Sequence, residues 1–164
     1  MFRPTTPVLI FLLATLFCFP LNGQTPPSGV LQTPQDGSTI QGPVTKITGT
    51  GNITFGKYAD GTTIHAGNHR LRFKIFKDGN DVTNLFVDQA DNNFFNIAEN
   101  GTFTMDMEYK NGNIPKGTYK LKIYVQANNS QGGAPAWGPL QILTGTPLLT
   151  IIDDGSGPGG GGFE

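Results

Sequence analysis

The sequence predicts an all-β fold, an antiparallel β-sandwich of about seven short strands. Apolar and polar residues alternate in short runs, as they do in strands with one buried side. Clusters of turn-forming residues, among them QDG, KDGN, ENG and NGN, separate these runs. No stretch of helical length carries apolar residues at the i, i+3, i+4, i+7 spacing without an intervening Gly, Pro or Asn cluster. We therefore expect strands and no helix.

The alternating runs place the expected strands, in chain order, at residues 30–33, 44–50 with a continuation to 55, 69–77, 94–97, 102–109, 118–127 and 140–144. The last apolar segment, PLLTII, is expected to add a strand at a sheet edge. Side chains along a strand point alternately to its two sides. In the run 118–127 the side facing the core would carry Tyr119, Leu121, Ile123 and Val125, and the side facing solvent Lys120, Lys122 and Tyr124.

The first residues have the pattern of an export signal. Arg3 precedes the apolar run VLIFLLATLFCF, Pro20 ends that run, and small residues follow. Cleavage is expected near Gly23, so that residues 1–23 form the signal peptide and Gln24 is the mature N-terminus. The run is shorter than the roughly 20 residues of a membrane-spanning helix, which argues against an uncleaved anchor. We expect a secreted, extracellular or cell-surface protein, or a periplasmic one, with no stable membrane insertion after cleavage.

The rest of the chain is expected to form one domain. Residues 24–28 would be an extended lead-in, residues 29–152 the sandwich, and residues 153–164 a flexible Gly-rich tail without periodicity. The single cysteine lies within the signal, so the mature domain would depend on its core rather than on disulfides. A formal net charge of −1 gives no general attraction to nucleic acid, and no nucleic-acid partner is expected.

Two segments resemble a known family. PQDGSTIQGPVTKITGT, residues 34–50, resembles the opening of bacterial immunoglobulin-like modules of exported proteins, where a Pro-x-x-Gly turn ends one strand and a Gly-Pro-Val run begins the next. PKGTYKLKIYV, residues 115–125, resembles a later strand of immunoglobulin-like and fibronectin-like sandwiches, which Gly117 opens here. The resemblance implies an immunoglobulin-like β-sandwich.

The resemblance also implies roles for individual residues. Tyr119 stands two residues before Leu121, where antibody domains have a cysteine, so its hydroxyl is expected to bond to the backbone upstream in a tyrosine corner. Phe73 is expected to take the place of the buried Trp of the third strand. Sandwiches of this kind serve adhesion, glycan binding, spacing and inhibition alike, so the resemblance leaves the function open.

Candidate metal ligands do not form a complete site in the sequence. His65 and His69 have no carboxylate between or directly beside them, whereas a metal site needs three or four ligands. The segments DGNDVTN and DQADNN offer oxygen ligands for calcium, but they lack the spacing of a calcium loop, and Asp and Asn are common in turns. We expect no metal and no cofactor.

No catalytic set is apparent, and no enzymatic activity is expected. The mature chain has no cysteine, no Gly-x-Ser-x-Gly motif and few serines. Asp106 and Glu108 form a carboxylate pair, but they alternate with inward-facing apolar residues. This pattern indicates a solvated strand face rather than a catalytic cleft.

The third and sixth expected strands together predict one positively charged surface, because such strands are neighbours in an immunoglobulin-like sandwich. Its outward side chains would be Arg70, Arg72, Lys74 and Phe76 from one strand, and Lys120, Lys122 and Tyr124 from the other. Asp106 and Glu108 are expected in the opposite sheet, and the WGPLQIL run contains no acid. The five positive charges are therefore expected to lack a compensating carboxylate.

Two interpretations of this surface stay open. Long cationic side chains can keep a sheet soluble and discourage edge pairing. Alternatively, the surface binds an acidic polysaccharide or the acidic surface of a protein, with Phe76 and Tyr124 as stacking or anchoring residues. Trp137, in GAPAWGP, is another candidate anchor at a strand rim, or it caps the end of the core.

The expected function is therefore non-catalytic binding or adhesion outside the cell through this surface. One alternative is a neutral carbohydrate-binding module that uses Trp137 and Tyr124. A second is a structural spacer or subunit of an extracellular assembly. A third is a small hydrolase or its inhibitor.

Overall fold

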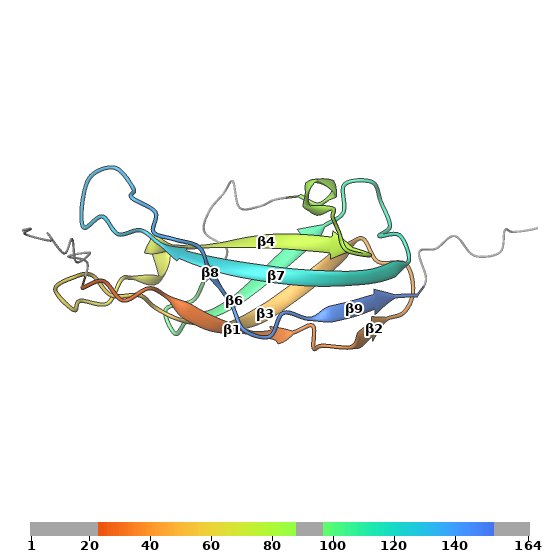
Figure 1. The fold of residues 1–164 in the computed structure, drawn as a ribbon, viewed down its shortest axis with the longest axis horizontal. Coiled ribbons are helices and arrows are strands. Elements are labelled where there is room, and N and C mark those ends of the chain that lie inside the picture. The colour runs from red at the N-terminus through yellow and green to blue at the C-terminus, as the bar shows by residue number, and fades with distance from the viewer. Residues whose placement is uncertain (1–22, 88–96, 153–164) are drawn as a thin grey trace, which may run out of the picture.

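The computed structural model describes residues 23–87 and 97–152, which form an all-β sandwich of two sheets (Figure 1). The predicted fold class is confirmed. The described residues contain no α-helix and two short 3-10 turns, η1 (Ala66–Asn68) and η2 (Thr83–Leu85). The expected signal peptide except Gly23, the Gly-rich tail and all of the expected strand 94–97 except Ile97 lie outside the described residues.

The smaller sheet has three strands in the order β1–β3–β6, all antiparallel. Their bounds are Ser28–Thr33 for β1, Lys46–Thr54 for β3 and Thr102–Glu108 for β6. Phe103, Met105 and Met107 of β6 point into the core, as predicted. A Cβ on Gly51 of β3 would lie 2.7 Å from the Phe103 ring. The glycine therefore lets this ring pack directly against the β3 backbone.

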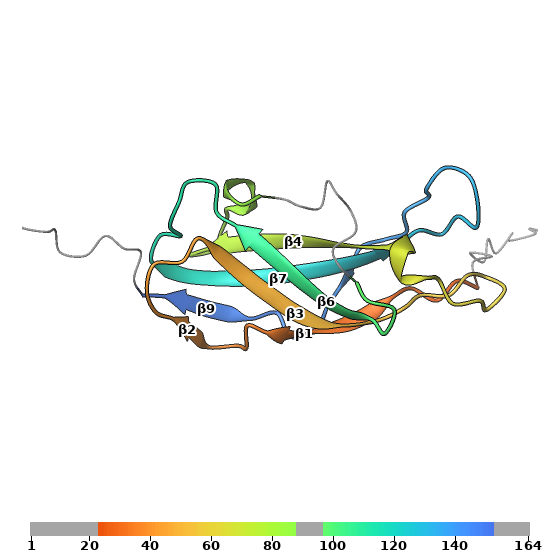
Figure 2. The ribbon, with the colours of Figure 1, turned by 180° about the vertical axis from the view of Figure 1, so that it is seen from behind.

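The larger sheet has six strands, in the order β2–β9–β7–β4–β5, with β8 also paired to β7. Their bounds are Ser38–Ile40 for β2, His69–Lys77 for β4, Asn80–Asp81 for β5, Gly117–Ala127 for β7, Gln141–Ile142 for β8 and Leu148–Ile151 for β9. This sheet faces the viewer in Figure 1, and the opposite view brings β3 and β6 to the front (Figure 2).

The larger sheet departs from the predicted arrangement in three respects. The alternation did not reveal β2 and β5, because strands of three and two residues are too short to show a period. β2 pairs in parallel with β9, so the sandwich is not wholly antiparallel. The prediction of an edge position for β9 is wrong, since β9 pairs with β7 on one side and with β2 on the other.

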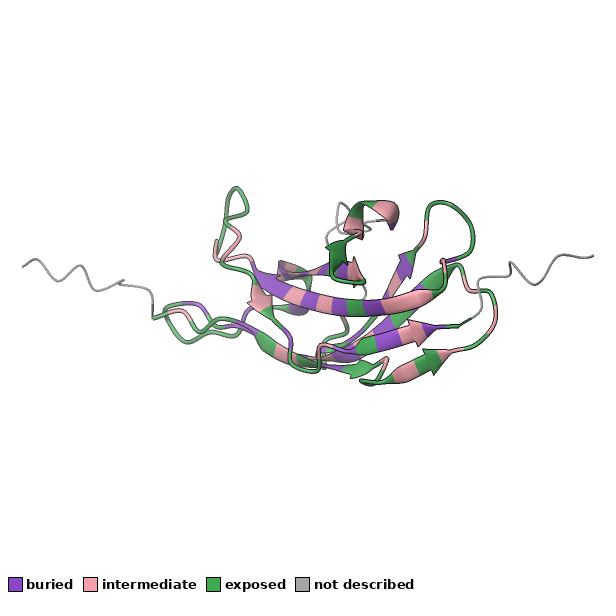
Figure 3. Ribbon diagram, turned by 45° about the vertical axis from the view of Figure 1, so that its right-hand side comes forward, coloured by how far each residue is buried: buried purple, intermediate pink, exposed green. Residues whose placement is uncertain are grey.

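Both sheets turn their apolar sides toward one shared core. Figure 3 shows the alternation along β7, where every second residue from Tyr119 to Val125 is buried, and the last residues, Gln126 and Ala127, are buried as well. The hydroxyl of Tyr119 donates a hydrogen bond to the carbonyl oxygen of Pro115 at 2.6 Å. This is the predicted bond to backbone upstream. Phe73 of β4 is also in the core, as predicted.

A second, smaller apolar cluster lies beneath the loops at one end of the sandwich. Tyr58 and Ile64 of the β3–β4 loop pack there with Ala127, the last residue of β7. The described chain starts at this end and finishes at the opposite end (Figure 1).

Candidate anion-binding face

β4 and β7 pair antiparallel along their common length, which determines the side chains that share a face. The register sets Arg70 opposite Gln126, Arg72 opposite Tyr124, Lys74 opposite Lys122 and Phe76 opposite Lys120. Apart from Gln126, which is itself buried at the end of β7, these positions alternate with buried ones, so their side chains lie on the outer side of the sheet. The basic face is defined here as Arg70, Arg72, Lys74 and Phe76 of β4 with Lys120, Lys122 and Tyr124 of β7. The predicted pairing of the two strands is confirmed.

One carboxylate partly compensates the basic face, so the expectation that none would do so is wrong. Asp81 of β5 lies with Oδ2 3.7 Å from Nζ of Lys74. Hydrogen bonds from Thr83, with a smaller contribution from Lys74, lower the pKa of Asp81. Within residues 23–87 and 97–152, no carboxylate lies at ion-pair distance from Lys120 or Lys122. The face therefore keeps an excess of positive charge.

Arg70 is held in place at one end of the basic face. Its Nε donates a hydrogen bond to Oε1 of Gln126 at 2.8 Å, and Nε2 of Gln126 donates to the carbonyl oxygen of Gly138 at 2.7 Å. The guanidinium carbon lies 4.1 Å from the centroid of the Trp137 ring. Burial, and then the charge of Arg72, lowers the pKa of Arg70. The structure thus brings Trp137, which is half-buried, next to the face as predicted for a rim position.

Lys122 lies over an aromatic ring of the neighbouring strand. Its ammonium nitrogen is 5.1 Å from the centroid of the Phe76 ring, a cation–π arrangement. Lys74 is directly opposite Lys122, and like charges in that position destabilise a strand pair. The Phe76 ring offsets part of this repulsion without removing the charge.

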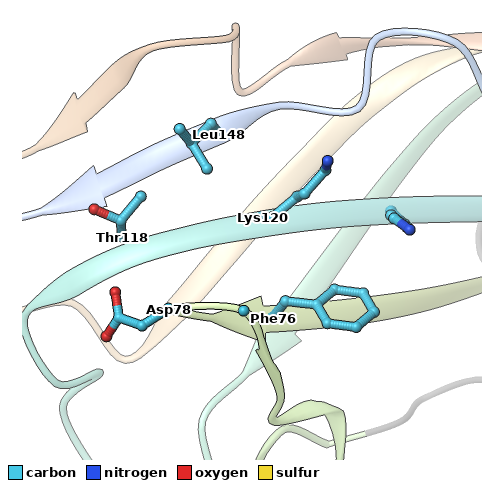
Figure 4. A pocket seen from close by; sticks show the side chains of 7 residues that line it. Phe76, Asp78, Thr118, Lys120 and Leu148 are labelled. Atoms are coloured by element: carbon cyan, nitrogen blue, oxygen red, sulfur yellow. The ribbon is translucent and has the colours of Figure 1, made fainter.

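A groove of about 310 Å³ lies at the other end of the basic face, across β4, β7 and β9. Lys120 pairs with Phe76 on one side and with Leu148 of β9 on the other, so the three side chains stand in a row across the sheet. Leu148 is 47% exposed, which is high for a leucine. Figure 4 shows Asp78 and Thr118 together toward one end of this groove.

We define this groove by six side chains: Phe76, Asp78, Thr118, Lys120, Lys122 and Leu148. Sequence reasoning identified three of them and missed Asp78, Thr118 and Leu148. The period of two could have revealed Asp78 and Thr118, since they continue the outward positions of β4 and β7. Leu148 could not be found this way, because its place depends on the pairing of β9 with β7.

The two histidines have separate positions and do not form a metal site. His69 is fully buried, and its Nε2 accepts a hydrogen bond from the backbone N–H of Gly56 at 3.2 Å. Its Nδ1 lies 3.0 Å from the carbonyl oxygen of His65, whose own side chain is exposed. Burial lowers the pKa of His69. In the described ranges, no three His, Cys, Asp or Glu side chains come together as metal ligands.

The remaining candidate residues take structural positions. Asp106 accepts hydrogen bonds from Lys46 at 2.6 Å and from Thr48 at 2.7 Å on the outer side of the smaller sheet, and Glu108 is exposed there. The expected solvated strand face is confirmed. Of the two possible calcium segments, DGNDVTN forms the β4–β5 turn and η2, whereas DQADNN lies outside the described residues.

Comparison of the chain with protein-family models, with curated proteins and with solved structures gave no match. In the part of the chain that the structure describes, no helix is long and apolar enough to cross a bilayer.

Proposed function

We propose that this protein is an exported, non-catalytic binding module that recognises an anionic glycan or another anionic partner through its basic face. The observation that carries the proposal is the β4–β7 register, which gathers five cationic side chains on one side of one sheet. The pattern of the first residues, which is typical of an export signal, supports a place at the cell surface or outside the cell.

The composition of the face favours binding over solubility alone. Mixed charges would keep a sheet soluble without the repulsion between Lys74 and Lys122. Aromatic rings are interleaved with the cations, and Phe76, Tyr124 and Trp137 are all half-buried rather than fully exposed. Cations beside aromatic and apolar surface can both attract an anionic group and pack against the rest of the ligand.

The neutral carbohydrate module is the weaker alternative. A sugar ring stacks on an open aromatic face, and the Arg70 guanidinium occupies one face of Trp137. This contact uses Trp137 to position a cation rather than to offer that side of the ring to a ligand.

We also infer that the sandwich is of the immunoglobulin-like type. The inference is supported by the Tyr119–Pro115 hydrogen bond and by the neighbouring positions of β4 and β7 in one sheet, with β3 and β6 in the other. These are features of immunoglobulin domains.

The proposal is tested by retention on an acidic-glycan column. The wild-type protein should be retained at low salt and released as the salt concentration rises, because screening weakens the attraction. The double variant Lys120→Glu with Lys122→Glu should pass through unretained, with an unchanged circular dichroism spectrum. Lys46→Glu, on the other sheet, reverses a charge away from the basic face and should be retained like the wild type.

Unchanged retention of the double variant would sink the proposal. Retention on a neutral glycan that Trp137→Ala abolishes would instead favour the carbohydrate module. If neither column retains the protein and light scattering shows oligomers, the structural alternative is favoured. The opposite positions of the two ends of the described chain would suit such a spacer (Figure 1).

A further inference from the structure

The groove on the basic face combines three kinds of contact within one small volume. Lys120 and Lys122 supply positive charge, Phe76 and Leu148 supply apolar surface, and Asp78 with Thr118 supplies a carboxylate and a hydroxyl. A surface that attracted any polyanion would need only the first kind. The presence of all three in about 310 Å³ indicates a ligand with several kinds of group close together.

Asp78 is placed in the groove by the local backbone. Asp78 and Gly79 form the two-residue turn between β4 and β5, with φ angles of 48° and 85°. Positive φ at both central residues defines a type I′ hairpin turn, for which Asp-Gly is a preferred sequence. The backbone N–H of Asp78 also donates a hydrogen bond to the carbonyl oxygen of Thr118 at 3.2 Å. The tight turn therefore places Asp78 at the same end of the groove as Thr118 (Figure 4).

A carboxylate in an anion-binding groove restricts the ligand. Asp78 repels a second negative group that comes close to it, and the repulsion grows with the charge of that group. The same carboxylate accepts strong hydrogen bonds from neutral hydroxyl groups. The ligand should therefore place its anionic group near the lysines and hydroxyl groups near Asp78.

We propose that the groove binds a hexuronate residue of an acidic polysaccharide, an inference that rests on the proposed function of the basic face. The sugar carboxylate lies near the ammonium groups of Lys120 and Lys122. The apolar side of the sugar ring packs against Phe76 and Leu148. Ring hydroxyls donate hydrogen bonds to the carboxylate of Asp78. The hydroxyl of Thr118 donates a hydrogen bond to another ring hydroxyl or accepts one from it.

The test compares four polymers in solution by isothermal titration calorimetry: polygalacturonate, dextran sulfate, polyglutamate and neutral dextran. Polyglutamate has carboxylates but no sugar ring, and dextran sulfate has sugar rings with sulfate esters instead of carboxylates. The wild-type protein should bind polygalacturonate at least tenfold more tightly per charge than either of the other polyanions. Neutral dextran should not bind.

Two variants test the contacts. Asp78→Asn tolerates the same backbone conformation and replaces a charged acceptor with a neutral one, so it should lower the affinity for polygalacturonate by roughly three- to tenfold. The same change should raise the affinity for dextran sulfate, because it removes a repulsive charge. Phe76→Leu should weaken polygalacturonate binding several-fold while leaving polyglutamate binding nearly unchanged, because polyglutamate has no sugar ring to pack against Phe76. Lys46→Gln, on the other sheet, should change none of these values.

The outcomes separate this inference from the proposed function. If polyglutamate or dextran sulfate binds as tightly as polygalacturonate, and Asp78→Asn leaves the ratio unchanged, the uronate inference is overturned while the anion-binding face stands. An acidic protein partner would then be favoured if polyglutamate bound best. If no polyanion binds, both the inference and the proposed function fail.

Discussion

The outer sides of the two sheets differ in the contacts that their cationic side chains make. On the smaller sheet, Thr33 and Thr50 lie with their hydroxyl oxygens 2.5 Å apart, and Asp106 accepts hydrogen bonds from both Lys46 and Thr48. The charge of Lys46 is thus neutralised on its own face. On the larger sheet Arg70 and Lys122 instead lie beside aromatic rings, and Asp81 is the one described carboxylate in ion-pair contact with a lysine of the basic face.

This difference separates the structural requirement from the functional one. Both sheets need a polar outer side, and the smaller sheet meets this need with threonines and a local ion pair. The larger sheet carries the repulsion between Lys74 and Lys122 although neutral residues could fill the same positions. A destabilising repulsion of this kind favours a binding role for the face, because natural proteins often have lower stability where they bind a ligand.

The largest expected effect concerns the core that the two faces share. Leu121 of β7 is fully buried beneath the basic face, and Leu121→Ala should lower the free energy of unfolding by about 2–5 kcal/mol. Urea titration followed by circular dichroism and by the fluorescence of Trp137, the single tryptophan, would measure it. The two signals should change together. Separate transitions would show that the sheets unfold independently and that the faces do not share one core.

The next effect is a dependence of stability on pH, which arises from His69 at the start of β4. Burial holds its pKa below the ordinary value of about 6.5. As the pH falls below about 6.5, His69 of the unfolded chain binds a proton, whereas His69 of the folded chain stays neutral until a lower pH. The free energy of unfolding should therefore decrease below about pH 6.5, with a slope of at most ~1.4 kcal/mol per pH unit from this group. Above that pH its contribution is complete.

Urea titrations at pH 7.5 and pH 5.5 would measure this slope. His69→Gln should reduce the difference between the two pH values. His65→Gln, which changes the exposed neighbour, should leave it as in the wild type. An unchanged difference in the His69 variant would assign the pH dependence to other groups.

A smaller effect is expected from the hydrogen bond between Tyr119 and Pro115 on the buried side of β7. Tyr119→Phe removes a hydroxyl that donates at 2.6 Å, and it should lower the free energy of unfolding by roughly 0.5–1.5 kcal/mol. Tyr124→Phe, on the outer side of the same strand, is the matched control and should change it less. Equal unfolding midpoints for wild type and Tyr119→Phe would argue against a stabilising role of this bond.

The parts of the fold that follow from local alternation could be predicted from the sequence. The limits of β4 and β7, their inward and outward sides and the Tyr119 bond all depend on a period of two or on a short motif. The neighbours of β9 could not be predicted in this way. Leu149 and Ile151 show which side of β9 is buried, but nothing in their spacing indicates that β2 pairs with the outer edge of this strand.

The candidate site could likewise be predicted only where its residues follow the alternation of a long strand. Its cations were predictable because they lie on two long strands whose pairing the resemblance implied. Asp81 and Leu148 reach the face from β5 and β9, where short strands give a weak signal. Arg70 of β4 contacts Trp137, which lies far away in the sequence, in the segment between β7 and β8. Only the folded structure shows this contact.

The smallest expected effect is the salt dependence of stability, which compares the two faces directly. Added salt screens the repulsion between Lys74 and Lys122, so it should stabilise the wild-type protein at this position by a few tenths of a kcal/mol. Lys122→Gln removes one partner, and the gain in the free energy of unfolding between 0.02 M and 0.5 M sodium chloride should become smaller by about that amount.

Lys46→Gln removes an attraction instead, because Lys46 pairs with Asp106. Its gain on adding salt should be larger than in the wild type. Urea midpoints at the two salt concentrations decide the matter. If both variants shift the salt dependence in the same direction, the two faces do not differ in the way that their contacts indicate.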